Sequence, residues 1–185
     1  MKNILLILTF LLALSCKAQN PVVSFTDYYK NYQSRVDGVY VKDLEGFFPP
    51  YIGTWKWESG NDSFTITISK VAMEYWGDAS TKRYEDVLYG DIRYTKNGVE
   101  VINPFVGQNL LKISSAIPRN GKFRFSFKDP FKNKYGKVFI TLINSNTQIK
   151  FHLQNNEGLR VLQPGEIDDP TFSIPRRTDI ILTKQ

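Results

Sequence analysis

Acidic side chains are the residues of this sequence that could most readily form a catalytic site. Cleavage of a glycosidic bond requires only two carboxyl groups held about 5–10 Å apart. The candidate carboxylates are Glu58, Glu85, Asp86 and Asp91, provided that their strands are neighbours. The aromatic residues that lie near these acids in the chain, and on which a sugar ring could stack, are Tyr75, Trp76, Tyr84 and Tyr89. Because the chain has 18 acidic residues, such pairs arise without any function. We therefore predict a protein that is not an enzyme, with a carboxylate-based glycosidase as the alternative.

Histidine and cysteine are too scarce for most other kinds of site. The chain contains one histidine, His152, and one cysteine, Cys16. Zinc, copper and iron sites need several such donors, and a hydrolytic triad needs a base next to a nucleophile. The acidic run at 165–169 lacks the spacing of a twelve-residue calcium loop. The sequence therefore predicts no metal and no cofactor, and it places His152 on a solvent-facing side of a strand.

The first nineteen residues predict export. Lys2 precedes an apolar run at 4–14, and small or polar residues from Ser15 onward end it. This is the pattern of a secretory signal, and an apolar run of this length is too short for a stable membrane span. We predict a signal peptide over residues 1–15 and lipid attachment at Cys16. The protein would then be anchored in the cell envelope, on the outer membrane. Cleavage after Ala18, without lipid, is the alternative.

The net charge of the chain is positive. It is +6 over the whole sequence, and the basic residues are scattered along the chain without forming a run. For an exported protein, anionic lipid head groups or acidic glycans are more relevant partners than nucleic acid, which we do not expect to be bound. We interpret the charge as a solvated basic surface, with a specific anion site as the alternative.

The hydrophobic pattern divides the remaining chain into two parts. Residues 16–36 predict a tether followed by a short helix, because aromatic residues near 25–36 repeat at helical spacing. Residues 37–185 alternate apolar and polar positions in short runs separated by turns, as in Phe123–Phe127, and Asn97-Gly98 predicts a tight hairpin. We expect one all-β domain of about eight or nine antiparallel strands, either a barrel or a sandwich, in which most runs alternate with period two.

Two stretches resemble known families. The residues from Asp37 to Leu44 and from Pro50 to Lys56, with the opening 15–19 and the closing 178–185, resemble a family of small exported bacterial lipoproteins, of Bacteroidetes type, with unknown function. Gly53-Thr54-Trp55 is also similar to the Gly-x-Trp of lipocalins. That likeness implies a ligand-holding barrel, and it implies that Arg176 or Arg177 packs across the face of Trp55 in a cation–π contact.

Two functions from different classes follow. In the first, the barrel binds an apolar or amphipathic small molecule. Its lining residues would be Trp55, Trp57, Phe64, Ile66, Phe125 and Phe127. In the second, the protein is a ligand-free structural or interaction protein that docks onto another envelope component. The aromatic residues of that docking patch would be Tyr28, Tyr29, Tyr32 and Trp76.

Overall fold

The computed structural model describes residues 20–77, 81–103, 110–114, 116–132, 134–155, 171–175 and 179–185. Its strands are β1 (Val22–Ser24), β2 (Val39–Lys42), β3 (Gly53–Ser59), β4 (Asp62–Tyr75), β5 (Arg83–Lys96), β6 (Val99–Ile102), β7 (Leu111–Ile113), β8 (Lys122–Lys128), β9 (Tyr135–Ile143), β10 (Gln148–Asn155) and β11 (Ile180–Lys184). The helical elements are α2 (Phe25–Lys30) and the 3-10 turns η1 (Tyr32–Ser34) and η2 (Pro49–Tyr51). No helix in these ranges is long and apolar enough to cross a membrane.

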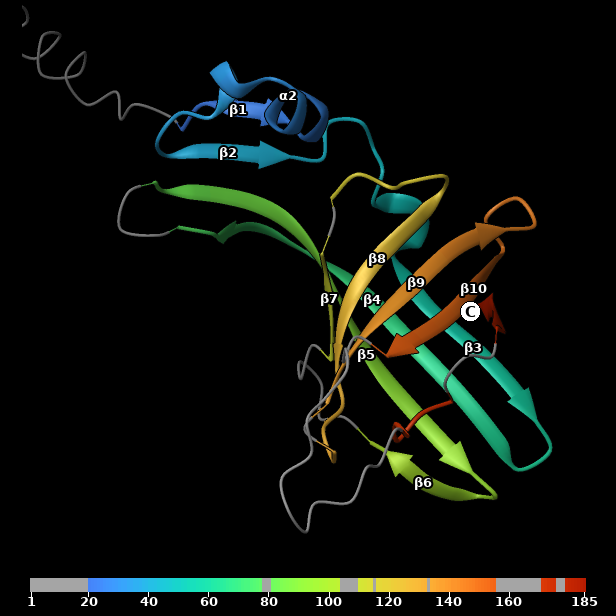
Figure 1. Ribbon diagram of the computed structural model, residues 1–185. Coiled ribbons are helices and arrows are strands. Elements are labelled where there is room, and N and C mark those ends of the chain that lie inside the picture. Colours follow the sequence, from blue (N-terminus) through green and yellow to red (C-terminus); the bar gives the residue numbers. More distant parts are fainter. Residues whose placement is uncertain are drawn as a thin grey trace, which may run out of the picture.

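Eight of the described strands close into an antiparallel barrel, which confirms the all-β prediction and selects the barrel over the sandwich. The order around it is β5-β4-β3-β11-β10-β9-β8-β7. A short seam closes it, where Tyr89 pairs with Lys112 and Gly90 with Leu111. β11 is inserted between β3 and β10, so the end of the described chain completes the wall (Figure 1).

Period-two alternation decides what fills the barrel. In β8 the residues alternate between exposed cations or serine and fully buried phenylalanines, and β10 alternates in the same way. The buried side chains belong to one hydrophobic core, in which the rings of Phe64 and Phe151 lie 5.0 Å apart. Removing this apolar surface from water is the main driving force for closing the barrel.

Aromatic residues also close both ends of the barrel. At one end Phe48 and Tyr51 pack against Phe123, with ring centroids 5.6 and 4.6 Å apart. At the other end the buried Phe172 lies 6.0 Å from Phe127. The carboxylate of Asp129 accepts hydrogen bonds from the backbone and hydroxyl of Ser173, and so fixes the covering segment.

An arm extends from one side of the barrel, which the sequence did not predict. β4 and β5 each span 14 residues. The C-terminal end of β4 and the N-terminal end of β5 extend together beyond the barrel (Figure 1). There β2 pairs with β5 and β1 pairs with β2, both in parallel, and α2 lies beside them. The sequence predicts a turn over residues 39–42, because Gly38 and Pro49-Pro50 flank them. The strand forms because Val39 and Val41 are buried against the arm.

The local predictions mostly agree with these elements. A short helix is present, but it ends at Lys30, and a separate 3-10 turn follows. The hairpin at Asn97-Gly98 is confirmed, with φ angles of 52° and 77° that suit this residue pair. β7 was not expected, since three residues are too few to show a period.

Candidate functional site: a cationic groove outside the barrel

The residues predicted to line a ligand cavity lie in the core. Trp55, Phe64, Ile66, Phe125 and Phe127 are each 0% exposed, and Trp57 is partly buried beside them. A side chain with no accessible surface has no water-sized void next to it. These five residues therefore fill the interior at their positions and leave no space there for a ligand.

A lysine lies over the ring of Trp55. The ammonium of Lys184, in β11, lies 5.1 Å from the centroid of the Trp55 ring, while Arg176 and Arg177 lie outside the described residues. The indole nitrogen of Trp55 donates to the carbonyl of Tyr51 at 2.8 Å, so its polar group is satisfied inside the core. The contact forms because Lys184 is paired directly with Trp55 across β11 and β3.

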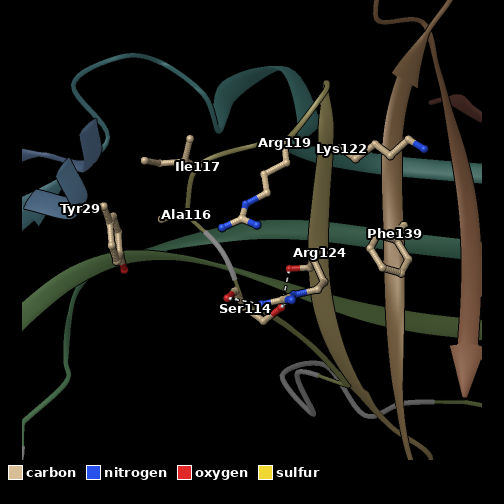
Figure 2. Close-up of a pocket in the computed structure, with 8 residues that line it drawn as sticks. All are labelled: Tyr29, Ser114, Ala116, Ile117, Arg119, Lys122, Arg124 and Phe139. Carbon is tan, nitrogen blue, oxygen red and sulfur yellow. Dashed lines mark hydrogen bonds between the residues drawn. The ribbon is translucent and has the colours of Figure 1, made fainter. Parts of the chain in front are cut away.

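A groove of about 610 Å³ lies outside the barrel, between α2 and the outer faces of β8 and β9. Its lining combines cationic, hydroxyl and apolar groups from segments far apart in the chain (Figure 2). The lining residues are Tyr29, Ser114, Ala116, Ile117, Arg119, Lys122, Arg124 and Phe139. The sequence predictions singled out Tyr29 among them, and only for the docking patch.

A tight turn holds Arg119 at the rim of the groove. Arg119 and Lys122 exchange both backbone hydrogen bonds, each at 3.0 Å, around Asn120 and Gly121. Both central residues have positive φ, 51° and 67°, which an Asn-Gly pair adopts with little strain. Figure 2 shows Arg119 extending from this turn into the space between Tyr29 and β8, whereas Lys122 extends the other way, over β9.

Arg124 forms the floor of the groove and is oriented by Ser114. Its Nε donates to the Ser114 hydroxyl at 2.9 Å, and its Nη2 donates to the Ser114 carbonyl at 3.4 Å. A guanidinium carries five N–H donors in a rigid plane. The bonds to Ser114 therefore fix the plane and leave further donors available to a bound acceptor.

The cations of the groove are not neutralised locally. Among the residues that the structure describes, Arg119, Lys122 and Arg124 have no carboxylate at ion-pair distance. Guanidinium groups bind carboxylates and phosphates through paired hydrogen bonds. Two of them beside Ile117 and Phe139 make a site suited to an anionic group attached to an apolar body.

Tyr29 closes the groove on the side of α2. Its hydroxyl donates to Glu85 at 2.8 Å, and Arg83 forms an ion pair with the same carboxylate at 3.2 Å. Burial, and then the neighbouring Glu85, raise the pKa of the Tyr29 hydroxyl well above its ordinary value. Tyr29 therefore lines the groove as an uncharged residue, and its hydroxyl is hydrogen-bonded to Glu85.

Three of the four candidate catalytic carboxylates, Glu58, Glu85 and Asp86, are held in separate sets of contacts. Glu85 and Asp86 are consecutive in β5 and so point to opposite faces, and Glu58 pairs with Lys56 on β3. Asp86 accepts hydrogen bonds from Tyr40, the backbone of Asp43 and Lys70. The acid directly opposite Glu85 is Glu74, on β4, which the sequence analysis did not select.

Glu74 has partners of the same kinds as Glu85 and Asp86. Tyr89 and Lys112 both bind it, the lysine at 2.7 Å. Each of the three carboxylates in this region thus has one tyrosine hydroxyl and one cation as partners. These contacts fasten strands and helix together, and the protein's fold already explains them.

The predicted aromatic patch divides between buried and exposed members. Tyr28 is 6% exposed whereas Tyr32 is 81% exposed. A second pocket, of about 430 Å³, is lined by Tyr28, Tyr32 and Trp76 together with Arg35 and Arg83. The guanidinium carbons of Arg35 and Arg83 lie 5.5 and 5.2 Å from the Tyr28 ring centroid, within cation–π range.

Of the remaining candidates, His152 lines a small pocket of about 320 Å³ together with Lys122, Lys150 and Asp179. His152 lies on the outer side of β10, 2.8 Å from Asp179. In the described ranges no three histidine, cysteine or acidic side chains are grouped to hold a metal ion. Cys16, with the rest of the predicted signal segment, and the acidic run at 165–169 lie outside those ranges.

Fold and groove together define a closed antiparallel β-barrel with a solid interior around its inward aromatic residues and a cationic groove on its outside. The chain belongs to a family of unknown function, DUF6705, whose model matches residues 1–185. No curated protein and no solved structure matches the chain significantly. This family has no known activity, and the groove is the feature of the structure that points most directly to a function.

Proposed function

We propose that this protein is an exported, lipid-anchored binding protein of the cell envelope, and that its ligand is an anionic amphiphile held in the outer groove. Arg119 and Arg124 bind the anionic head group, while Ile117 and Phe139 contact the apolar part. The observation that carries the proposal is a pair of guanidiniums in one partly apolar groove that have no carboxylate partner among the described residues.

Both the charge and the apolar surface of the groove contribute to binding such a ligand, whereas a purely apolar ligand would use only the apolar surface. A groove rimmed by unneutralised cations repels a cationic ligand and gains little from a neutral one. A hydrogen bond to a charged group contributes about 1.5–3 kcal/mol. The apolar walls add affinity in proportion to the ligand surface that they remove from water.

The export and the anchor rest on the signal-like start of the chain. Lys2, the apolar run at 4–14 and Cys16 follow each other in the order that a lipoprotein signal requires. Labelling cells with a radioactive fatty acid tests the anchor directly. Label on the wild type, and none on Cys16→Ser, is expected; equal labelling of both would contradict lipid attachment at this residue.

Calorimetric titration tests the ligand class. All described elements lie within residues 20–185, so this fragment is used after circular dichroism has shown that it is folded. Decyl phosphate, below its micelle concentration, is the probe. Decyltrimethylammonium has the same tail with the opposite charge, and inorganic phosphate has the head group alone. We expect decyl phosphate to bind and decyltrimethylammonium not to bind.

Single substitutions then locate the binding. Arg119→Gln is expected to weaken decyl phosphate binding about tenfold or more, because it removes a charge-assisted hydrogen bond. The matched control is Arg93→Gln, which removes an exposed cation from the outer face of β5. Equal binding of the cationic amphiphile, or equal losses in both variants, would overturn the proposal.

Docking onto another envelope protein is the second candidate function. It is favoured by the second pocket, where Tyr32 and Trp76 lie beside Arg35 and Arg83. Aromatic residues and arginine are enriched at the centres of protein interfaces. Cross-linking through a photoreactive residue at Tyr32 in intact cells tests it, and a single reproducible adduct would support this function.

A further inference from the structure

We propose that the outer face of β8, β9 and β10 is a surface that binds an anionic phospholipid membrane. This inference goes beyond the ligand in the groove. Lys122 and Arg124 belong to both surfaces, whereas Lys128, Lys137 and Lys150 lie outside the groove lining. The inference also assigns a role to the net positive charge, which the sequence alone left as a scattered surface property.

The strand register gathers cations that are far apart in the chain. Reading across β8, β9 and β10, Lys122 aligns with Thr141 and Lys150, and Arg124 aligns with Phe139 and His152. Side chains opposite each other in such pairs lie about 5 Å apart, and successive outward residues of a strand about 7 Å apart.

The next rows add two more cations. Ser126 aligns with Lys137, and Lys128 with Tyr135. These outward positions are exposed or half-buried, whereas the residues between them are buried in the core. The face therefore presents five lysine or arginine side chains: Lys122, Arg124, Lys128, Lys137 and Lys150.

Acidic residues contribute little to this face. In the described part of the chain, the carboxylate that approaches it is Asp179, which pairs with Lys150 at 3.2 Å and with His152 at 2.8 Å. Lys128 and Lys137 have no carboxylate at ion-pair distance among the described residues. Counted over the described residues, the face therefore carries a clear excess of positive charge, even with Asp179 included.

Apolar side chains between and beside the cations favour a membrane over a glycan. Tyr135 is 53% exposed, Phe131 at the adjoining turn is 67% exposed, and Ile181 on β11 is 38% exposed. Surfaces that lie on membranes combine lysine or arginine with aromatic and aliphatic groups that enter the head-group region. An aliphatic side chain such as Ile181 offers nothing to a sugar hydroxyl.

Vesicle co-sedimentation tests this inference with the same 20–185 fragment, which carries no lipid anchor. Phosphatidylcholine vesicles with and without phosphatidylglycerol are compared at low and high salt. We expect binding only with phosphatidylglycerol. We also expect it to weaken as salt shortens the screening length from about 10 Å at 0.1 M to about 3 Å at 1 M.

The deciding variant reverses two charges, Lys128→Glu with Lys137→Glu. Each lysine near such a membrane changes partitioning about fivefold, so we expect at least about a tenfold loss. The matched control is Lys42→Glu with Lys82→Glu, two exposed lysines on the arm, and it should bind as the wild type does. Decyl phosphate binding in the groove should persist in both variants, which separates the two proposals.

Three outcomes would overturn the inference: binding to pure phosphatidylcholine, equal losses in the two double variants, or binding to alginate without binding to the anionic vesicles. The last would identify the face as a site for acidic polysaccharide.

Discussion

The barrel interior and the junction between arm and barrel are both well packed, but by opposite means. Inside the barrel, alternate residues of strands such as β8 and β10 are apolar, and the largest of them are fully buried. At the junction, Glu85 and Asp86 are almost completely buried and are matched by tyrosine hydroxyls and cations. The first region depends on surface removed from water, and the second depends on each charge keeping its partners.

Because the two regions are stabilised differently, they should be sensitive to different kinds of substitution. An apolar core tolerates changes of shape that keep its volume, whereas a buried charge becomes costly as soon as one partner is lost. The interior should therefore respond to the size of a substitution. The junction should respond to the charge and the hydrogen-bonding capacity of a substitution, and to pH.

Truncating a core ring should produce the largest effect. Phe64→Ala removes a ring that is 0% exposed and lies 5.0 Å from Phe151, and we expect a loss of about 3–5 kcal/mol in unfolding free energy. Urea unfolding measures it. Thr65→Ala, on the outward side of the same strand, is the control and should change stability little. A small loss at Phe64 would mean that the interior has spare room, and would revive a ligand cavity.

Removing a buried charge at the junction should come next. Asp86→Ala leaves the hydroxyl of Tyr40, the backbone N–H of Asp43 and the ammonium of Lys70 without their acceptor. We expect a loss of about 2–4 kcal/mol in the same assay. The double variant with Lys70→Met should recover part of this loss, since it also removes the unpaired cation. If it recovers none, the charge pairing is not what stabilises the arm.

The contribution of Glu85 to stability should depend on pH. Burial raises the pKa of its carboxyl above the ordinary value, against the opposing effects of Tyr29 and Arg83. The folded state therefore holds this proton more tightly than the unfolded state, and the contribution of Glu85 to stability falls as pH rises through that window. Glu85→Gln does not ionise. Its stability relative to the wild type should increase from about pH 4 to pH 7.

Chemical unfolding at several pH values measures this change. Glu58→Gln, which removes an exposed carboxylate of β3, is the matched control for the loss of an acid outside the junction. A constant difference between Glu85→Gln and the wild type would contradict a raised pKa.

The cation over Trp55 should give the smallest effect. Lys184→Gln removes an ammonium 5.1 Å from the ring, and contacts of this kind at exposed positions contribute about 0.5–1 kcal/mol. The thermal unfolding midpoint measures the loss. Lys184→Arg keeps the charge and should retain most of the stability, so equal losses in both variants would show that the charge is unimportant.

The sequence predicts the interior much better than the junction, for a physical reason. A residue such as Phe125 reveals its buried side through its own neighbours, because alternation is local. The partners of Glu85 and Asp86 are Tyr29 and Tyr40, 56 and 46 residues away, and no periodic pattern links them. The parallel pairing of β2 with β5 also joins segments far apart in the chain, so the sequence pattern did not predict it.

The groove was only partly predictable. Asn120-Gly121 signals a tight turn as clearly as Asn97-Gly98 does, and the alternation from Lys122 to Lys128 places Arg124 on the outside. Those signals locate two basic residues on one hairpin. That Ser114 and Tyr29 lie beside them depends on how β7 and α2 pack, which the sequence does not display.

The position of β11 has a consequence for how the molecule is made. Its two neighbours are β3 and β10, so the wall keeps a gap until residues 180–184 arrive, after every other barrel strand has been synthesised. Until then β3 and β10 present open edges, and unpaired strand edges are prone to aggregation. Completion of the barrel is thus timed by β11, which is synthesised after the other barrel strands that the structure describes.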